Sequence, residues 1–160
     1  MTDGPAASGP PALAVAPVAG RVVALSEVPD AVFAGQLVGA GVALEPDTDG
    51  GAVTVTAPVA GRLVKVHPHA FVVVGDDGRG LLVHVGIDTV RLGGRGFELL
   101  AAEGDTVGQG RPVVRVDPTV VAEAGLSAVC PVVLLDSAPD SVDQTAVGRV
   151  VSAGEALFAY

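Results

Sequence analysis

Aromatic side chains and positive charges are scarce in this chain of 160 residues. There is no tryptophan, and the aromatic residues are four phenylalanines and one tyrosine. Base-stacking surfaces and carbohydrate-binding clefts need such rings, so neither is indicated. Nine Lys and Arg residues stand against eighteen Asp and Glu, and the resulting formal charge of −9 repels a phosphate backbone. We therefore expect no nucleic-acid partner.

Cysteine, long apolar runs and N-terminal positive charge are also lacking. The single cysteine, Cys130, cannot form an internal disulfide, and we interpret it as a small buried hydrophobic residue. The longest charge-free stretch, 4–20, has 17 residues but contains four prolines, which excludes a membrane-spanning helix. No Lys or Arg precedes Arg21, so a secretory signal is not indicated. We expect a cytoplasmic protein with no direct membrane insertion.

Apolar residues make up 49% of the chain, enough for a substantial core. From Leu13 onward, short runs of Val, Leu and Ala are interrupted by Gly, Pro or Asp roughly every eight to twelve residues, a spacing typical of sandwiches and barrels. We predict an all-β fold, an antiparallel β-sandwich or barrel-like structure with one or two short helices. The predicted strands are 13–16, 20–25, 36–39, 41–45, 52–57, 61–66, 69–75, 80–85, 98–100, 112–116, 130–135, 147–151 and 156–160.

One segment carries the signature of a helix. Asp117 can cap it, Pro118 suits its first position and Gly125 can end it, so we predict a helix from Asp117 to Leu126. Residues 1–12 are small, rich in proline and without periodicity, which indicates a flexible N-terminal tail. The remaining residues, 13–160, are expected to form a single domain.

The chain contains an internal duplicated motif. Residues 16–25, APVAGRVVAL, are echoed 41 residues later by residues 57–66, APVAGRLVKV. In each copy a proline that cannot join a ladder and a glycine that permits a tight bend precede a strand. The two copies are therefore expected to form equivalent corners.

All three histidines, His67, His69 and His84, lie within 18 residues. His69 begins one predicted strand and His84 lies near the end of the next, across the turn 75–80, so a hairpin can bring the two rings together. One imidazole can attack phosphorus while its second nitrogen is held by a backbone acceptor, and a neighbouring imidazole can stabilise the phosphoryl oxygens. Gly86 offers such a backbone carbonyl. This arrangement predicts a phosphohistidine site.

Five motifs follow one another along the chain: VPDAVF at 28–33, APVAG at 57–61, HAF at 69–71, HVGIDTV at 84–90 and GRGF at 94–97. Together and in this order they resemble those of the glucose-type enzyme IIA of the bacterial phosphoenolpyruvate-dependent sugar phosphotransferase system. The resemblance runs from about Leu13 to Tyr160.

The resemblance implies an antiparallel β-sandwich that takes a phosphoryl group from the histidine of HPr and passes it to a cysteine of a IIB component. It places the phosphorylated histidine at His84 and its paired histidine at His69. It also implies partner-binding residues, with acidic groups at Asp30 and Asp88 and an apolar rim at Val32, Phe33, Leu37 and Val38. Some members also regulate permeases or kinases, which are further candidate partners.

Two positions depart from the family pattern at the site. His67 stands where the family usually has a hydroxyl residue, and Leu82 where it usually has an aromatic one. The N-terminal tail also lacks the basic amphipathic pattern that some members use at membranes. These departures bear on the hydrogen-bond network of the site and on membrane recruitment.

A zinc metallopeptidase of the lysostaphin-like class is the main alternative. Its HxH and HxxxD motifs have counterparts at 67–69 and 84–88, but in reversed order. A lipoyl or biotinyl module is a second alternative, yet Lys65, the only lysine, lies in a predicted strand rather than a turn. No cofactor is expected to be required, although His69 and His84 could bind zinc, with His67 less favoured as a third ligand.

Overall fold

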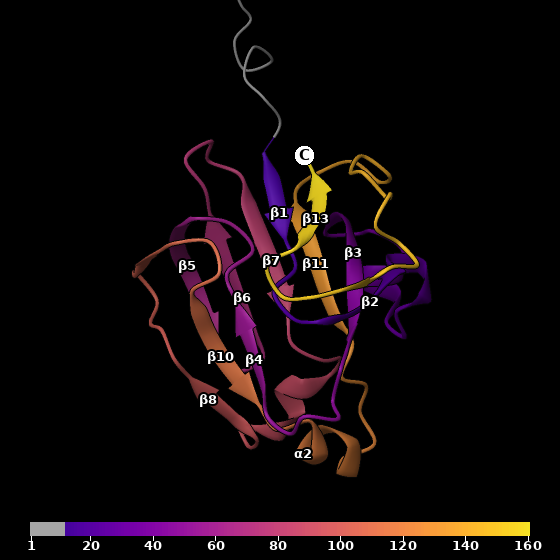
Figure 1. The fold of residues 1–160 in the computed structure, drawn as a ribbon, viewed down its shortest axis with the longest axis vertical. Helices are drawn as coiled ribbons and strands as arrows, with labels where there is room; N and C mark the ends of the chain where they lie inside the picture. Colours follow the sequence, from indigo (N-terminus) through magenta and orange to yellow (C-terminus); the bar gives the residue numbers. More distant parts are fainter. Residues whose placement is uncertain (1–11) are drawn as a thin grey trace, which may run out of the picture.

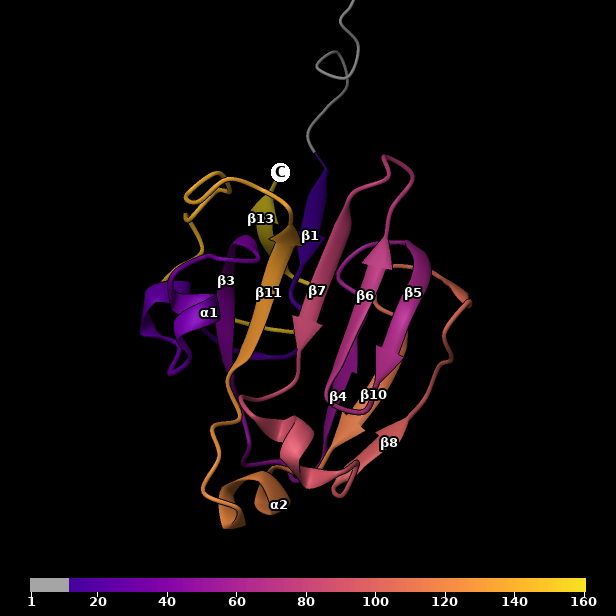
Figure 2. The ribbon, with the colours of Figure 1, turned by 180° about the vertical axis from the view of Figure 1, so that it is seen from behind.

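The computed structural model describes residues 12–160 as two layers of β-sheet in which every strand pair is antiparallel (Figures 1 and 2). The all-β prediction is confirmed. One layer is an eight-stranded sheet whose order is β12 (Val150–Val151), β2 (Gly20–Ala24), β3 (Gly39–Pro46), β11 (Cys130–Leu135), β7 (Gly80–His84), β6 (Ala70–Val74), β5 (Gly61–His67) and β9 (Thr106–Val107).

Two small sheets make the other layer. One has the order β4 (Val53–Thr56), β10 (Pro112–Val116) and β8 (Phe97–Leu99), and the other pairs β1 (Leu13–Val15) with β13 (Ala156–Ala159). The helical segments are α1 (Ala31–Ala34), α2 (Pro118–Glu123) and two 3-10 helices, η2 (Leu25–Glu27) and η3 (Thr89–Leu92). No helix within residues 12–160 is long and apolar enough to cross a membrane.

The main core fills the space between the layers. In β7 the burial pattern alternates, so Leu81 and Val83 are buried while Leu82 and His84 are only partly covered. Phe71 from the large sheet and Phe158 from β13 are among the largest fully buried side chains of this core. A second apolar cluster lies apart from it, under α1 and around Leu82. It is made of Val23, Leu25, Val28, Phe33, Ala43, Ile87, Val129 and Val133.

The structure corrects one predicted strand. Residues 36–39 do not form a strand of their own, because Gln36 has a φ of 55° and the chain turns before β3 begins at Gly39. The preceding residues form the short helix α1, which the sequence analysis missed. Asp30 starts this helix by accepting hydrogen bonds from the Val32 and Phe33 amides at 2.8 and 3.3 Å. The two-residue strand β9 also lies in a segment without a predicted strand.

The predicted helix at Asp117–Leu126 is confirmed as α2, although it is shorter. The Asp117 carboxylate accepts a hydrogen bond from the Thr119 amide at 2.9 Å, and Pro118 occupies the first turn. Gly125 follows the helix with a φ of 76°. Of the predicted tail, residues 1–11 lie outside the described residues. Ala12 exchanges two backbone hydrogen bonds with Tyr160, at 3.0 and 2.9 Å.

The two copies of the repeated motif form equivalent corners, as predicted. The Val15 amide donates to the Pro58 carbonyl at 3.0 Å, and the Thr56 amide donates to the Pro17 carbonyl at 2.9 Å, so each corner is bonded to the other. The glycine that starts each strand lies against a neighbouring strand. A Cβ on Gly20 would be 2.1 Å from the Glu45 carbonyl oxygen, and one on Gly61 would be 2.1 Å from that of Val74.

The duplication also includes the turns that receive the corners. Val22 bonds to the backbone of Gly148 and Arg149 in the same way that Leu63 bonds to Gly104 and Asp105. Ala16 forms the same pair of backbone hydrogen bonds with residues 154–155, and Ala57 forms it with residues 110–111. In both copies these partners lie six residues after the partners of Val22 and Leu63. Segments 104–111 and 148–155 are therefore structural equivalents, and β9 and β12 close the two ends of the large sheet.

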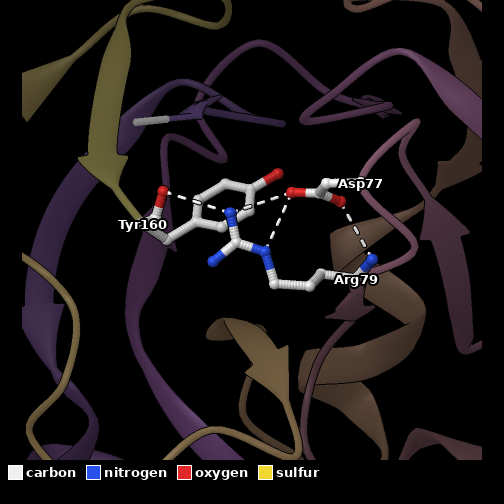
Figure 3. Close-up of polar contacts among 3 residues, drawn as sticks. All are labelled: Asp77, Arg79 and Tyr160. Atoms are coloured by element: carbon white, nitrogen blue, oxygen red, sulfur yellow. Dashed lines mark hydrogen bonds and ion pairs between the residues drawn. The ribbon is translucent and has the colours of Figure 1, made fainter. Parts of the chain in front are cut away.

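A cluster of Asp77, Arg79 and Tyr160 ties the β6–β7 turn to the C-terminal residue (Figure 3). The Arg79 guanidinium lies 4.6 Å from the centre of the Tyr160 ring, donates to the Tyr160 carbonyl at 3.3 Å and pairs with Asp77 at 2.8 Å. Burial raises the pKa of Tyr160, and the Asp77 charge adds to this while Arg79 opposes it. This turn follows β6, whereas His69 precedes β6, so the cluster and the histidines lie at opposite ends of that strand.

The close approach at the two corners generates a stability prediction. Gly61→Ala places a methyl group against the Val74 carbonyl and should lower the free energy of unfolding by about 2 kcal/mol, the usual scale of overpacking. Gly20→Ala should behave in the same way. Gly108→Ala is the control, because a Cβ there meets nothing within 4 Å. Urea unfolding of the three variants measures the difference, and equal midpoints would contradict the prediction.

Candidate functional site

The alternation of β7 places His84 on the outer face of the large sheet. His84 pairs with Ala70 of the neighbouring strand, so His69 lies directly beside that pair. The ring centres of His69 and His84 are 5.5 Å apart with an interplanar angle of 64°. The hairpin therefore brings the two imidazoles together, as the sequence predicts.

Two contacts fix the His84 ring. Its Nδ1 is 2.5 Å from the Gly86 carbonyl oxygen, and because a carbonyl can only accept, Nδ1 carries the proton. The Phe33 ring meets the imidazole edge-on at 5.2 Å between centres. Burial lowers the pKa of His84, although the Gly86 hydrogen bond and the charges of Asp30 and Asp88 oppose it. The neutral ring therefore has its Nε2 unprotonated.

His69 lies in the two-residue turn between β5 and β6 rather than in a strand, since His67 pairs directly with Ala70. The turn is anchored by the Val85 amide, which donates to the His69 carbonyl at 2.7 Å. Burial lowers the pKa of His69, and the proximity of His84 and then His67 lowers it further. Both members of the pair thus favour the neutral form.

His67 ends β5 and is exposed. Its ring stacks on that of His69, with centres 5.5 Å apart and an interplanar angle of 17°. The two rings lie together across the turn at residues 68–69 and not along one face of a continuous strand. Within residues 12–160, however, no group of three or more His, Cys, Asp and Glu side chains is placed to hold a metal ion.

The acidic residues flank His84 from two segments. Asp30 precedes α1, and its carboxylate is engaged in capping that helix. Asp88 follows the Gly86–Ile87 turn in a left-handed conformation, with a φ of 60°, and is exposed. The charges of both residues act on His84.

The four residues expected to form an apolar rim have different environments. Leu37 and Val32 are 73% and 43% exposed, so they can contact a partner. Phe33 is buried with its ring against that of His84, and Val38 packs on the second apolar cluster. Leu82, at the position where the family usually has an aromatic residue, packs on the same cluster.

Three other residues surround the Gly86 turn, and the sequence analysis assigned none of them to the site. The Ile87 amide donates to the Ser127 carbonyl at 2.9 Å, and Thr89 lies buried below the turn. Cys130 is buried as predicted, and burial raises the pKa of its thiol to about 11, although a backbone contact with Gly86 lowers it. The thiol is therefore protonated and unreactive near neutral pH.

The fold and this site define a β-sandwich protein with a paired-histidine centre. Comparison with known proteins identifies its family. Residues 13–139 match the family described as the phosphoenolpyruvate-dependent sugar phosphotransferase system, EIIA 1. The chain belongs to this EIIA family, and its relatives make it of the glucose type.

Among the relatives, the glucose-specific EIIA component of Staphylococcus aureus (strain Mu50 / ATCC 700699) is 39% identical over 124 residues, covering 76% of this chain and 72% of that protein. The glucoside-specific EIICBA component of Staphylococcus carnosus (strain TM300) is 35% identical over 149 residues, covering 92% of this chain and 21% of that protein. The chain thus spans about a fifth of that longer relative. Glucose permease IIA from Mycoplasma capricolum has a TM-score of 0.85 and 31% identity, covering 94% of this chain and 96% of that one.

The lowered pKa values of the paired histidines predict how stability depends on pH. An unfolded histidine titrates near pH 6.5, whereas burial lowers the pKa of His84 and His69 in the native state. As the pH falls below about 6.5, the unfolded chain takes up protons first, so the free energy of unfolding decreases; above that range the full stability is present. Urea unfolding between pH 7.5 and 5 should show this slope. It should be shallower in His84→Gln, and an equal slope would contradict the assignment.

Proposed function

We propose that this chain is a phosphocarrier that takes a phosphoryl group from phospho-HPr on Nε2 of His84 and passes it to a cysteine of a IIB component, coupled to sugar uptake. The observation that carries the proposal is the Nδ1 hydrogen bond to Gly86, which leaves Nε2 with a free electron pair beside a second imidazole. The reaction belongs in the cytoplasm, where HPr receives its phosphoryl group from the phosphoenolpyruvate-dependent system. The family membership supports this role.

Both transfer steps balance without a cofactor. The Nε2 electron pair of His84 forms a bond to phosphorus while the bond from phosphorus to the donor's histidine breaks, and the donor imidazole leaves with that electron pair. In the second step a cysteine thiolate of the IIB component attacks phosphorus, and His84 leaves in the same way. His69 stabilises the phosphoryl oxygens during each transfer by donating from its ring.

The relatives support the proposed partners. The two Staphylococcus proteins are described as glucose-specific and glucoside-specific, and another relative, from Klebsiella pneumoniae, as an N-acetylglucosamine-specific EIICBA component. In the EIICBA relatives the IIB and IIC parts share a chain with IIA. We therefore propose a IIB component of a sugar permease as the acceptor for this chain, with regulated permeases or kinases as further partners.

The test of the proposed function is phosphoryl transfer by two variants. His84→Ala should take up no phosphate from phospho-HPr, because the accepting nitrogen is gone. His69→Ala should fold but transfer about a hundredfold more slowly, since one preorganised donor to the phosphoryl oxygens is lost. Radiolabelled transfer with phosphoenolpyruvate, enzyme I and HPr measures both, and the acid-labile phosphate is mapped by proteolysis. Label persisting on His69 in the first variant would overturn the assignment.

The acidic residues should speed the encounter with a basic face of HPr. Asp30→Asn with Asp88→Asn removes two charges while keeping the helix cap, because asparagine caps as well as aspartate. Phosphorylation should slow by about tenfold at low ionic strength and by less at high salt.

A matched control is Asp76→Asn with Asp136→Asn. It removes the same charge at the β6–β7 turn and after β11, at the far ends of these strands from His69 and His84. Stopped-flow phosphorylation at two salt concentrations compares the pairs, and equal slowing would attribute the effect to net charge instead.

We further propose that His69 and His84 can hold zinc, with water or a partner's carboxylate completing the coordination. The two neutral imidazoles suit zinc as ligands, whereas a peptidase site would need a third protein ligand. Zinc affinity should fall below about pH 6 as the ligands take up protons. Titration calorimetry of the wild type and His84→Ala tests this, and no binding at micromolar zinc would reject the site.

A further inference from the structure

Thr89 is the one buried polar side chain among residues 12–160, with 1% of its surface exposed. Its hydroxyl donates to the Val85 carbonyl at 2.7 Å. Val85 is itself 2% exposed, so this carbonyl cannot turn to water for a partner. A buried carbonyl without a partner is costly, and Thr89 therefore holds the peptide that joins Val85 to Gly86.

The methyl group of Thr89 fixes the other side of the same turn. A Cβ on Gly86 would be 2.6 Å from Thr89 Cγ2 and 3.0 Å from the Ser127 carbonyl oxygen. Gly86 also has a φ of 79°, which favours glycine. The hydroxyl and the methyl group of Thr89 thus contact two consecutive residues, Val85 and Gly86. Gly86 lies between this methyl group and the Ser127 carbonyl, so it has no room to shift toward either.

We propose that Thr89 is a positioning residue for phosphoryl transfer: its hydroxyl and methyl hold the Val85–Gly86 turn so that the Gly86 carbonyl faces Nδ1 of His84. This inference rests on the proposed function of His84. Thr89 acts through the turn, since its hydroxyl bonds to Val85 and it is Gly86 that bonds to the imidazole.

Loss of this restraint would change which ring nitrogen of His84 carries the proton. A Gly86 carbonyl that turns away no longer stabilises the proton on Nδ1, so the ring also populates the form with the proton on Nε2. That form has no free electron pair on the nitrogen that accepts phosphate. Removing the outer hydrogen-bond partner of a metal-bound histidine typically costs about 10- to 100-fold in affinity or activity, and we expect a loss of that order here.

The variants separate positioning from general stability. Thr89→Val removes the hydroxyl and keeps the shape, whereas Thr89→Ser keeps the hydroxyl. Thr56→Val is the matched control, because the Thr56 hydroxyl also donates to a backbone carbonyl, that of Pro17, at 3.1 Å in the other layer. Thr89→Ala replaces Thr89→Val should the latter fail to fold, because it adds no bulk beside Gly86.

Two measurements are made on each variant. Nitrogen-15 NMR of the unphosphorylated protein reports which ring nitrogen of His84 carries the proton. Phosphorylation rates are measured with phospho-HPr and with phosphoramidate, a small donor that needs no protein contact. Thr89→Val should lose the uniform Nδ1–H form and slow about tenfold or more with both donors. Thr89→Ser keeps the hydroxyl but loses the methyl group, so it should retain Nδ1–H as the major form and have rates between those of Thr89→Val and the wild type. Thr56→Val should keep the wild-type spectrum and rates.

A wild-type tautomer and wild-type rates in the folded hydroxyl-removing variant would overturn the inference. Equal losses in Thr56→Val would also overturn it, by showing a merely structural role. A wild-type chain that takes no phosphate from phospho-HPr would instead overturn the proposed function, while the NMR comparison would still decide whether Thr89 positions His84.

Discussion

The hydrogen bond from Nδ1 of His84 to the Gly86 carbonyl, at 2.5 Å, is the contact on which the site depends. It joins a residue at the end of β7 to the turn that follows, so the ring can be held only if that turn is rigid. The turn is bonded on one side to His69, through the Val85 amide, and on the other to Ser127, through the Ile87 amide. The same backbone segment therefore places His69, fixes the tautomer of His84 and joins both to the core.

Burial and charge act in opposite directions on His84. Burial lowers its pKa and favours the neutral ring that can attack phosphorus, while Asp30 and Asp88 favour the charged ring. The balance lies with burial, because Phe33 and the second apolar cluster cover the outer face at this point. Under the proposed function, the acidic groups serve the encounter with a basic partner and still leave the accepting nitrogen unprotonated.

The sequence predicts the elements that local patterns determine, whereas it does not predict those that depend on tertiary contacts. The hairpin spacing of 69–75 and 80–85 was enough to bring His69 and His84 together, and the cap at Asp117 located α2. Helix α1 could not be found, because four residues carry little periodicity and Val32 and Phe33 favour strands. The contact between the Phe33 and His84 rings could not be found either, because it depends on how α1 packs on the sheet. No sequence pattern singles out Thr89, because the role proposed for it depends on contacts that form only in the folded chain.

The duplicated motif explains why the site forms where it does. The two copies correspond up to Leu25 and Val66, and both are held by equivalent corners and turns. Beyond that point they diverge: one continues into the turn that carries His69, and the other into η2 and the segment of Asp30 and α1. The two unlike continuations meet at His84, one supplying the second imidazole and the other supplying Phe33 and a carboxylate. The duplicated corners and strands thus set the positions of these segments, and the differences between the segments that follow the two copies provide the side chains around His84.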